Sequence, residues 1–340
     1  GSRGLGDVYK RQLEKIPMLT REDISREIAP IYNEEMKIAE IPTVFHEIET
    51  NGIGYLDLLF DLSDVPEKDL PMVGLLQAVL GIIDTEHYEY GELFNEINRY
   101  TGGIGTSLEL YPDVTKVREK EFKATFEIKA KALYGQIPFA IRMMKEILTA
   151  SKLDDEKRLK EILSMTKTRL QDRFLSAGHS AAALRAMSYK SPLSKFKDTT
   201  NGIGYYQNIR EMEEHFEDKK EEIINSLKAL SKLIFRKGNM MISYTATREG
   251  LAVLEEEIGS LKEALYPERT PESRCVLHCE KKNEGFKTSS KVQFAAKAGN
   301  FIDAGEEYNG ALQILKVIMS YEYLWINILS LIHISEPTRP

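Results

Sequence analysis

The chain contains 340 residues, of which 46 are basic and 53 are acidic, so its formal net charge is −7. This acidic balance argues against a nucleic-acid partner, because nucleic acids select surfaces on which basic side chains cluster. No apolar run is long enough to cross a bilayer, which argues against a membrane partner.

The two ends of the sequence are related to each other as DNA. When Gln12 is written as cag and Leu329 as ctg, the codons are reverse complements, and the pairing continues through all twelve positions outward. Such an inverted repeat is typical of an adapter ligated to both ends of a DNA insert, and it serves no purpose in a folded chain. We therefore expect residues 1–12 and 329–340 to be translated sequencing adapter, and the parent gene to extend beyond both ends.

Between these ends, the spacing of apolar residues predicts strands and helices. Thr20 and Asp23 have the spacing of a capping box that opens a short helix. Strands are predicted over 43–49, 51–63, 104–111, 119–132 and 239–246, with another that begins near 291. Helices are predicted over 66–83, 90–100, 137–149, 155–187, 211–235, 249–265 and 306–328. Pro267, Pro271 and the charged run 281–284 mark a linker before the last strand and helix.

The segment from 119 to 132 has the clearest pattern of all. Phe126 and Ile128 alternate with Thr125, Glu127 and other polar residues, which predicts a strand with one packed face and one wet face. With the helices that follow it, this pattern predicts an α+β fold in which helices pack on one face of an antiparallel-rich sheet. The strand and helix after the linker predict the start of a second unit of the same kind.

The hexapeptide TNGIGY occurs twice, at 50–55 and at 200–205. It lacks the third glycine of a dinucleotide-binding fingerprint, and its first copy leads into a predicted strand and not a helix. Because the flanking residues of the two copies differ, the hexapeptide indicates two similar turns and not an internal repeat.

The histidines show no spacing that is typical of catalysis or metal binding. His46, His87, His179, His215 and His278 lie outside any H-E-x-x-H or H-x-x-E-H sequence, the patterns that place two imidazoles and a carboxylate around zinc. The chain also contains no G-x-S-x-G sequence and no P-loop. We therefore predict no catalytic, cofactor-binding or metal-binding residue in this chain.

Cys275, His278 and Cys279 allow two interpretations. They could form half of a metal site, or they could lie in an ordinary strand or loop with free thiols. The second interpretation is favoured, because no further pair of ligands follows. Two thiols in a chain of this length do not form a disulfide scaffold, and they fit a reducing, cytoplasmic compartment.

Four stretches of the chain are similar to one protein family. They are NGIGYLDLLFDLSDVPEKDLP at 51–71, YGELFNEINRYTGGIGTSLELYPD at 90–113, RLQDRFLSAGHSAAALRAMSYKSP at 169–192 and ALQILKVIMSYEYLWINI at 311–328. As a set they resemble the presequence-protease branch of the pitrilysin and insulinase zinc metallopeptidases. The resemblance covers essentially all of residues 13–328.

This resemblance implies a parent enzyme with four homologous domains, whose two halves close around an unfolded peptide. It implies the end of a helical connector at 13–41, the non-catalytic third domain at 42–266, and a linker with the truncated start of the fourth domain at 267–328. Zinc and its inverted motif would lie in the N-terminal half of the parent, outside this chain. The implied partners are that catalytic half and the peptide substrate, and the implied location is a bacterial-type cytoplasm.

Two other interpretations remain open at this stage. The chain could belong to a scaffold or binding protein on the same fold without peptidase activity, since a fold does not fix a function. It could also be a self-contained interaction module. An intact inverted zinc motif upstream in the same gene would favour the peptidase, and its absence the scaffold.

Overall fold

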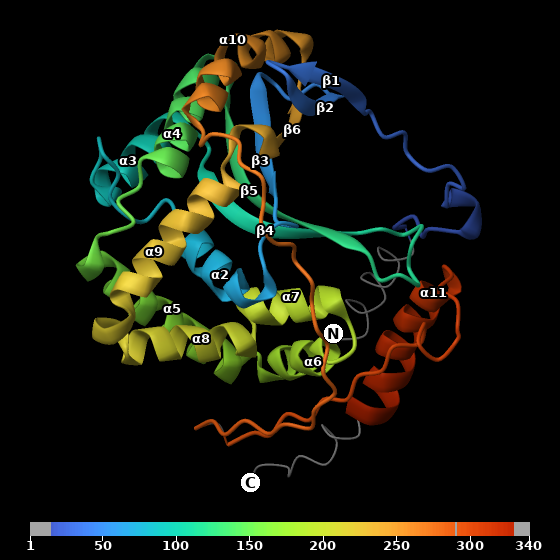
Figure 1. Ribbon diagram of the computed structural model, residues 1–340. Coiled ribbons are helices and arrows are strands. Elements are labelled where there is room, and N and C mark those ends of the chain that lie inside the picture. Colours follow the sequence, from blue (N-terminus) through green and yellow to red (C-terminus); the bar gives the residue numbers. More distant parts are fainter. Residues whose placement is uncertain (1–14, 290, 330–340) are drawn as a thin grey trace, which may run out of the picture.

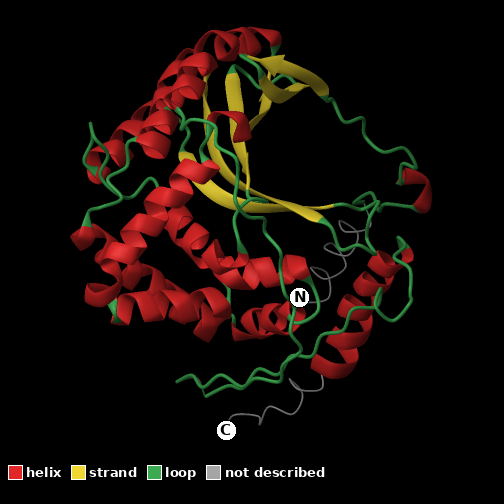
Figure 2. Ribbon diagram, viewed as in Figure 1, coloured by secondary structure: helices red, strands yellow, loops and turns green. Residues whose placement is uncertain are grey.

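A computed structural model describes residues 15–289 and 291–329 (Figures 1 and 2). The predicted adapter segments, apart from the backbone of residue 329, therefore lie outside the described residues. Within the described part, no helix is both long enough and apolar enough to span a membrane.

The centre of the molecule is a six-stranded sheet. Its strands are β1 (Glu34–Ile38), β2 (Ile41–Glu47), β3 (Ile53–Asp61), β4 (Ile104–Pro112), β5 (Phe122–Leu133) and β6 (Met240–Ala246). They lie in the order β1-β2-β6-β3-β5-β4, and only the β2–β6 pair is parallel. The predicted α+β class with an antiparallel-rich sheet is thereby confirmed. The sheet begins earlier than expected, because β1 lies inside the range predicted for the connector.

Helices cover one face of this sheet (Figure 2). They are α2 (Leu70–Val79), α3 (Tyr90–Tyr100), α4 (Ile137–Thr149), α5 (Glu156–Ser176), α6 (Gly178–Ser188), α7 (Pro192–Asn201), α8 (Ile203–Glu214), α9 (Phe216–Ile234) and α10 (Arg248–Ala264), with single 3-10 turns at Arg21–Asp23, Glu67–Asp69, Tyr134–Gln136 and Lys237–Asn239. The bounds of α3 and α4 agree with the predicted helices. The helix predicted over 155–187 is broken at Ala177, and α7 and the first half of α8 were not predicted.

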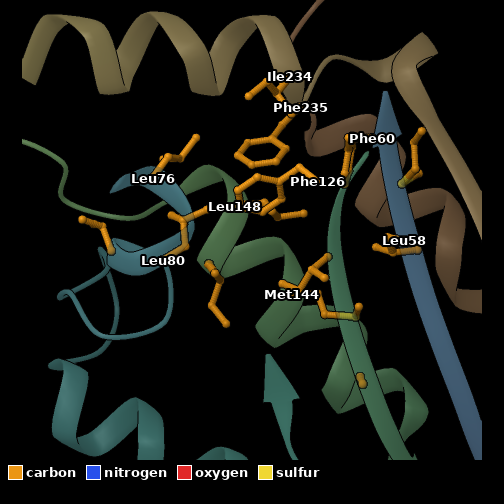
Figure 3. Packing of buried hydrophobic residues seen from close by; sticks show 14 of the residues in the cluster. Leu58, Phe60, Leu76, Leu80, Phe126, Met144, Leu148, Ile234 and Phe235 are labelled. Carbon is orange, nitrogen blue, oxygen red and sulfur yellow. The ribbon is translucent and has the colours of Figure 1, made fainter. Parts of the chain in front are cut away.

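The core between sheet and helices is built around three phenylalanine rings (Figure 3). Phe235, just after α9, packs edge-to-face against Phe60 of β3 at 5.0 Å and against Phe126 of β5 at 5.1 Å between ring centroids. All three side chains are fully buried. Truncation of such a ring to alanine typically costs about 3–5 kcal/mol, so this cluster holds α9 on the sheet.

The two copies of TNGIGY adopt different structures. In the first copy, Asn51 and Gly52 have φ of 53° and 78° and form a left-handed turn that leads into β3. In the second copy, α7 ends at Asn201, Gly202 has an extended backbone, and α8 begins at Ile203. The prediction of two similar turns is therefore wrong for the second copy, which is a junction between two helices.

The segment after Tyr266 has little regular structure. The strand predicted from residue 291 does not form, because no strand of the described residues lies beside it to complete its hydrogen bonds. The predicted last helix is present in part, as α11 (Ala311–Ile318), which continues as a π-helix over Met319–Leu329. Several of its apolar side chains are exposed, among them Ile314, Val317, Tyr321 and Ile326.

Candidate functional site

The face of the sheet that the helices leave uncovered carries a group of polar side chains. We call Asp57, Glu109, Tyr111, Thr125, Glu127 and Lys129 the open-face cluster. They come from β3, β4 and β5, and their strand neighbours on the other face, such as Leu58, Phe126 and Ile128, are buried in the core. The antiparallel register sets Asp57 opposite Lys129, and Glu109 opposite Thr125. Strand alternation therefore gathers all six side chains on one surface.

Glu127 lies at the centre of this cluster and is only 1% exposed. Its carboxylate accepts hydrogen bonds from the hydroxyls of Tyr111 and Thr125, the latter at 2.8 Å, and pairs with the Lys129 ammonium at 3.1 Å. The prediction that Thr125 and Glu127 lie on a wet face is therefore wrong. β5 is a central strand, so side chains from β4 and from β5 itself cover this carboxylate.

The charges of the cluster are unequal. Lys129 also pairs with Glu109 at 3.1 Å. Although burial lowers the pKa of Lys129, its hydrogen bonds to Glu127 and Glu109 raise that pKa above its usual range, so the side chain stays charged. One ammonium thus serves two carboxylates, while a third, Asp57, lies across the strand from it.

Asp57 has no hydrogen-bond or ion-pair partner for its carboxylate among residues 15–289 and 291–329. Burial raises the pKa of Asp57, and the negative charges of Glu127 and Glu109 add to this effect, while Lys129 opposes it. The open face therefore keeps one half-buried carboxyl group that its own chain does not neutralise. A cationic or hydrogen-bond-donating group of a ligand could pair with it.

The cluster borders the free edge of the sheet. β4 is an edge strand, and at its middle the Gln77 side chain of α2 donates to the Thr106 carbonyl at 3.1 Å, while the Thr106 hydroxyl donates back to the Gln77 carbonyl at 3.0 Å. This reciprocal pair occupies the edge at Thr106 only. In the described part of the chain, no strand pairs with β4 on its outer side, so residues 107–112 offer backbone groups to an extended peptide.

The histidines and cysteines singled out in the sequence are scattered over the structure. His46 bonds to the Tyr32 carbonyl and the Ser243 hydroxyl, His87 to Glu146, His215 to Glu211 and His278 to Glu67, while the His179 ring lies near the Phe294 ring. Cys275 and Cys279 are free thiols, and burial raises the pKa of both. Within the described ranges, no three His, Cys, Asp or Glu side chains are arranged to hold a metal ion.

The open-face cluster is suited to binding more than to covalent chemistry. Its lysine is paired with two of its carboxylates, and Glu127 is too enclosed to reach a substrate bond. The cluster was missed in the sequence because each residue taken alone fits a solvated strand face. The alternation of Glu109 and Tyr111 on one strand, matched by Thr125, Glu127 and Lys129 on the next, is the signal that could have indicated a polar network.

These features define an α+β domain with one helix-covered face and one polar, open face. The chain belongs to the family of peptidase M16 associated domains, subfamily C, whose model matches residues 8–212. The resemblance to pitrilysin-type peptidases noted in the sequence is thereby confirmed.

The similar proteins are much longer than this chain. It is 37% identical to Protein HypA of Clostridium perfringens over 93% of this chain and 32% of that protein. It is 24% identical to Presequence protease 1, chloroplastic/mitochondrial, of Arabidopsis thaliana over 92% of this chain and 29% of that protein. Among solved structures, a peptidase M16 inactive domain from Pseudomonas fluorescens matches with a TM-score of 0.47 and 14% identity, over 74% of this chain and 54% of that one. The chain therefore spans about a third of the length of these curated relatives.

Proposed function

We propose that this chain is a non-catalytic part of the C-terminal half of a zinc metalloendopeptidase that degrades short unfolded peptides. In this proposal its open face forms one wall of a closed peptide chamber, opposite the catalytic half of the same parent protein. Zinc and its ligands would be supplied by that other half. A wall of this kind excludes water and folded proteins and aligns the peptide, while the chemistry takes place elsewhere.

The observation that carries this proposal is the polar face left uncovered in a member of a peptidase-associated family. An ordinary domain surface is solvated and carries mobile charges. Here Glu127 is enclosed, Lys129 is held between two carboxylates, and the free edge of β4 lies alongside. An extended peptide could add to that edge by backbone hydrogen bonds and place its side chains over the cluster.

Site-directed photocrosslinking tests the position of the peptide. We would replace Tyr55, which is 44% exposed on the open face of β3, by p-benzoylphenylalanine, and add a short unfolded peptide. Leu175 of α5, 43% exposed in the helical layer, is the matched control. Crosslinks from position 55 but not from position 175 are expected. Equal yields at the two positions would contradict a peptide wall on the open face.

Hydrolysis assays test the assignment of the chemistry to another half. The purified chain is expected to cleave no peptide, with or without added zinc. Peptide hydrolysis that a chelator abolishes would show that the chain carries its own metal site and would overturn the proposal. Upstream sequence of the same gene offers a second test, since a parent without the inverted zinc motif would be a binding protein and not a peptidase.

A further inference from the structure

The segment between α10 and α11 crosses the helical layer in an irregular conformation. We call residues 267–289 and 291–307 the strap. It starts beside the Arg236–Tyr266 bridge, passes the loop after β3, where the Cys275 amide donates to the Ser63 carbonyl, and then crosses α6 and α7 (Figure 1). An irregular segment of this length gains little from its own backbone, so side-chain contacts must determine where it lies.

One contact in the strap has the geometry of a specific carboxylate receptor. The Arg185 guanidinium of α6 donates from Nε to Glu284 Oε2 at 2.8 Å and from Nη2 to Glu284 Oε1 at 3.0 Å. The Tyr189 hydroxyl donates a third hydrogen bond to the same carboxylate. Bidentate pairing of this kind is both stronger and more selective in orientation than an ordinary surface ion pair.

The receptor is held in place by contacts within the helical layer. Arg185 Nη1 donates to Asp198 Oδ2 of α7 at 2.6 Å, and the Asp198 side chain is buried. The Arg185 side chain is 12% exposed, and its guanidinium also lies 5.7 Å from the centre of the Phe286 ring. A guanidinium already fixed by one carboxylate loses little freedom when it takes a second, which favours binding of the strap.

The remaining ion pairs of the strap are weaker by comparison. Lys120 pairs with Asp303, and Arg118 with Glu307, both at the tip of the β4–β5 hairpin. The side chains of Arg118 and Glu307 are 67% and 81% exposed. Solvent screens such pairs, and they typically contribute little. Glu284, whose side chain is 24% exposed, is therefore the best-enclosed anionic anchor of the strap.

We propose that Arg185 and Tyr189 form a carboxylate-binding site whose occupant is Glu284 of the same chain, and that this contact is the latch that fixes the strap on α6 and α7. The strap leads directly into α11, which lies beside the β4–β5 hairpin (Figure 1). Opening of the latch would leave α11 tethered to the domain chiefly by the exposed pairs at the hairpin tip. The latch thus controls the position of the segment that follows the domain.

Hydrogen–deuterium exchange of the full chain tests this latch. Glu284→Gln keeps the side-chain shape but removes the charge, and amide exchange over the strap should then increase roughly tenfold or more, because charge-assisted hydrogen bonds are lost. Glu307→Gln is the matched control on an exposed pair and should change strap exchange by less than about twofold. Exchange in β3 and β5 should be unchanged in both variants.

A second variant separates the latch from a general loosening of the chain. Tyr189→Phe removes one hydrogen bond to Glu284 and leaves the Arg185–Asp198 pair in place, so strap exchange should rise by an intermediate factor. If Glu284→Gln leaves strap exchange within about twofold of the unmodified chain, the latch does not exist. The same holds if Glu284→Gln and Glu307→Gln have equal effects.

Discussion

Two buried carboxylates, Glu127 on the open face and Asp198 in the helical layer, show how burial can have different meanings in one chain. Asp198 is completely buried and pairs with Arg185 at 2.6 Å. It also accepts the backbone amides of Ile203 and Gly204, at 3.1 and 3.2 Å, at the start of α8. It therefore both satisfies the N-terminal amides of a helix and forms half of a buried ion pair.

Glu127 has no such backbone role. Its partners are two hydroxyls and a lysine, all of them side chains of the same uncovered face. Removal of Asp198 would disturb the junction of three helices, whereas removal of Glu127 would disturb only the surface pattern. The comparison teaches that a buried charge which satisfies backbone groups maintains the fold, while one which satisfies only side chains on an open face is available to be selected for binding.

The largest effect is expected from Asp198→Ala. It would leave the Arg185 guanidinium without its buried partner and two amides of α8 without an acceptor, so the free energy of unfolding should fall by about 3–5 kcal/mol. Urea denaturation followed by circular dichroism measures this change. Asp198→Asn, which keeps an acceptor oxygen for the amides, should lose less. A loss below about 1 kcal/mol for alanine would mean that the cap and ion pair do not maintain the junction.

Gly204→Ala tests the same junction through its packing. A Cβ at this position would lie 2.7 Å from Asp198 Oδ2 and 3.3 Å from Arg185 Nη1. Pushing these groups apart should lower the free energy of unfolding by about 1–3 kcal/mol. Gly91→Ala in α3, where nothing lies within 4 Å of the added Cβ, is the control and should be neutral or slightly stabilising. Thermal unfolding of the two variants in parallel would show whether the difference between them has the expected sign.

Glu127→Gln addresses the open face. The amide oxygen can still accept from Tyr111 and Thr125, and Glu109 still pairs with Lys129, so the loss of stability should be only about 1 kcal/mol. Peptide crosslinking at position 55 should fall at the same time, because the neighbouring side chains lose their fixed positions. A destabilisation as large as that of Asp198→Ala would abolish the distinction between the two carboxylates.

The smallest effect is expected from Asp57→Asn, and it should be stabilising at neutral pH. Burial raises the pKa of Asp57 above 3.8, so the folded chain keeps this proton to a higher pH than the unfolded chain does. The free energy of unfolding therefore falls as the pH rises through this interval. The asparagine variant should lack this fall, with little difference from the parent chain below pH 3.8. Urea denaturation at several pH values measures it, and a neutral-pH loss of stability would contradict the raised pKa.

Much of the fold could be predicted from periodicity. The bounds of α3 and α4 and the packed face of β5 follow from apolar spacing, because each of these elements buries one regular stripe. The break at Ala177 and the unpredicted α7 could not be predicted in this way, since Ser188, Ser194 and Asp198 are buried polar residues that interrupt the apolar pattern. The site was less accessible still, because the enclosure of Glu127 depends on which strands become its neighbours.

The repeated hexapeptide separates the two kinds of information. The sequence by itself determined that each copy interrupts a regular element, because asparagine followed by glycine disfavours the interior of helices and strands alike. Only the tertiary structure decided that the first copy leads into a strand and the second into a helix. The physical reason is that β3 finds β5 and β6 beside it, whereas the second copy finds the buried carboxylate of Asp198, which accepts the first amides of α8.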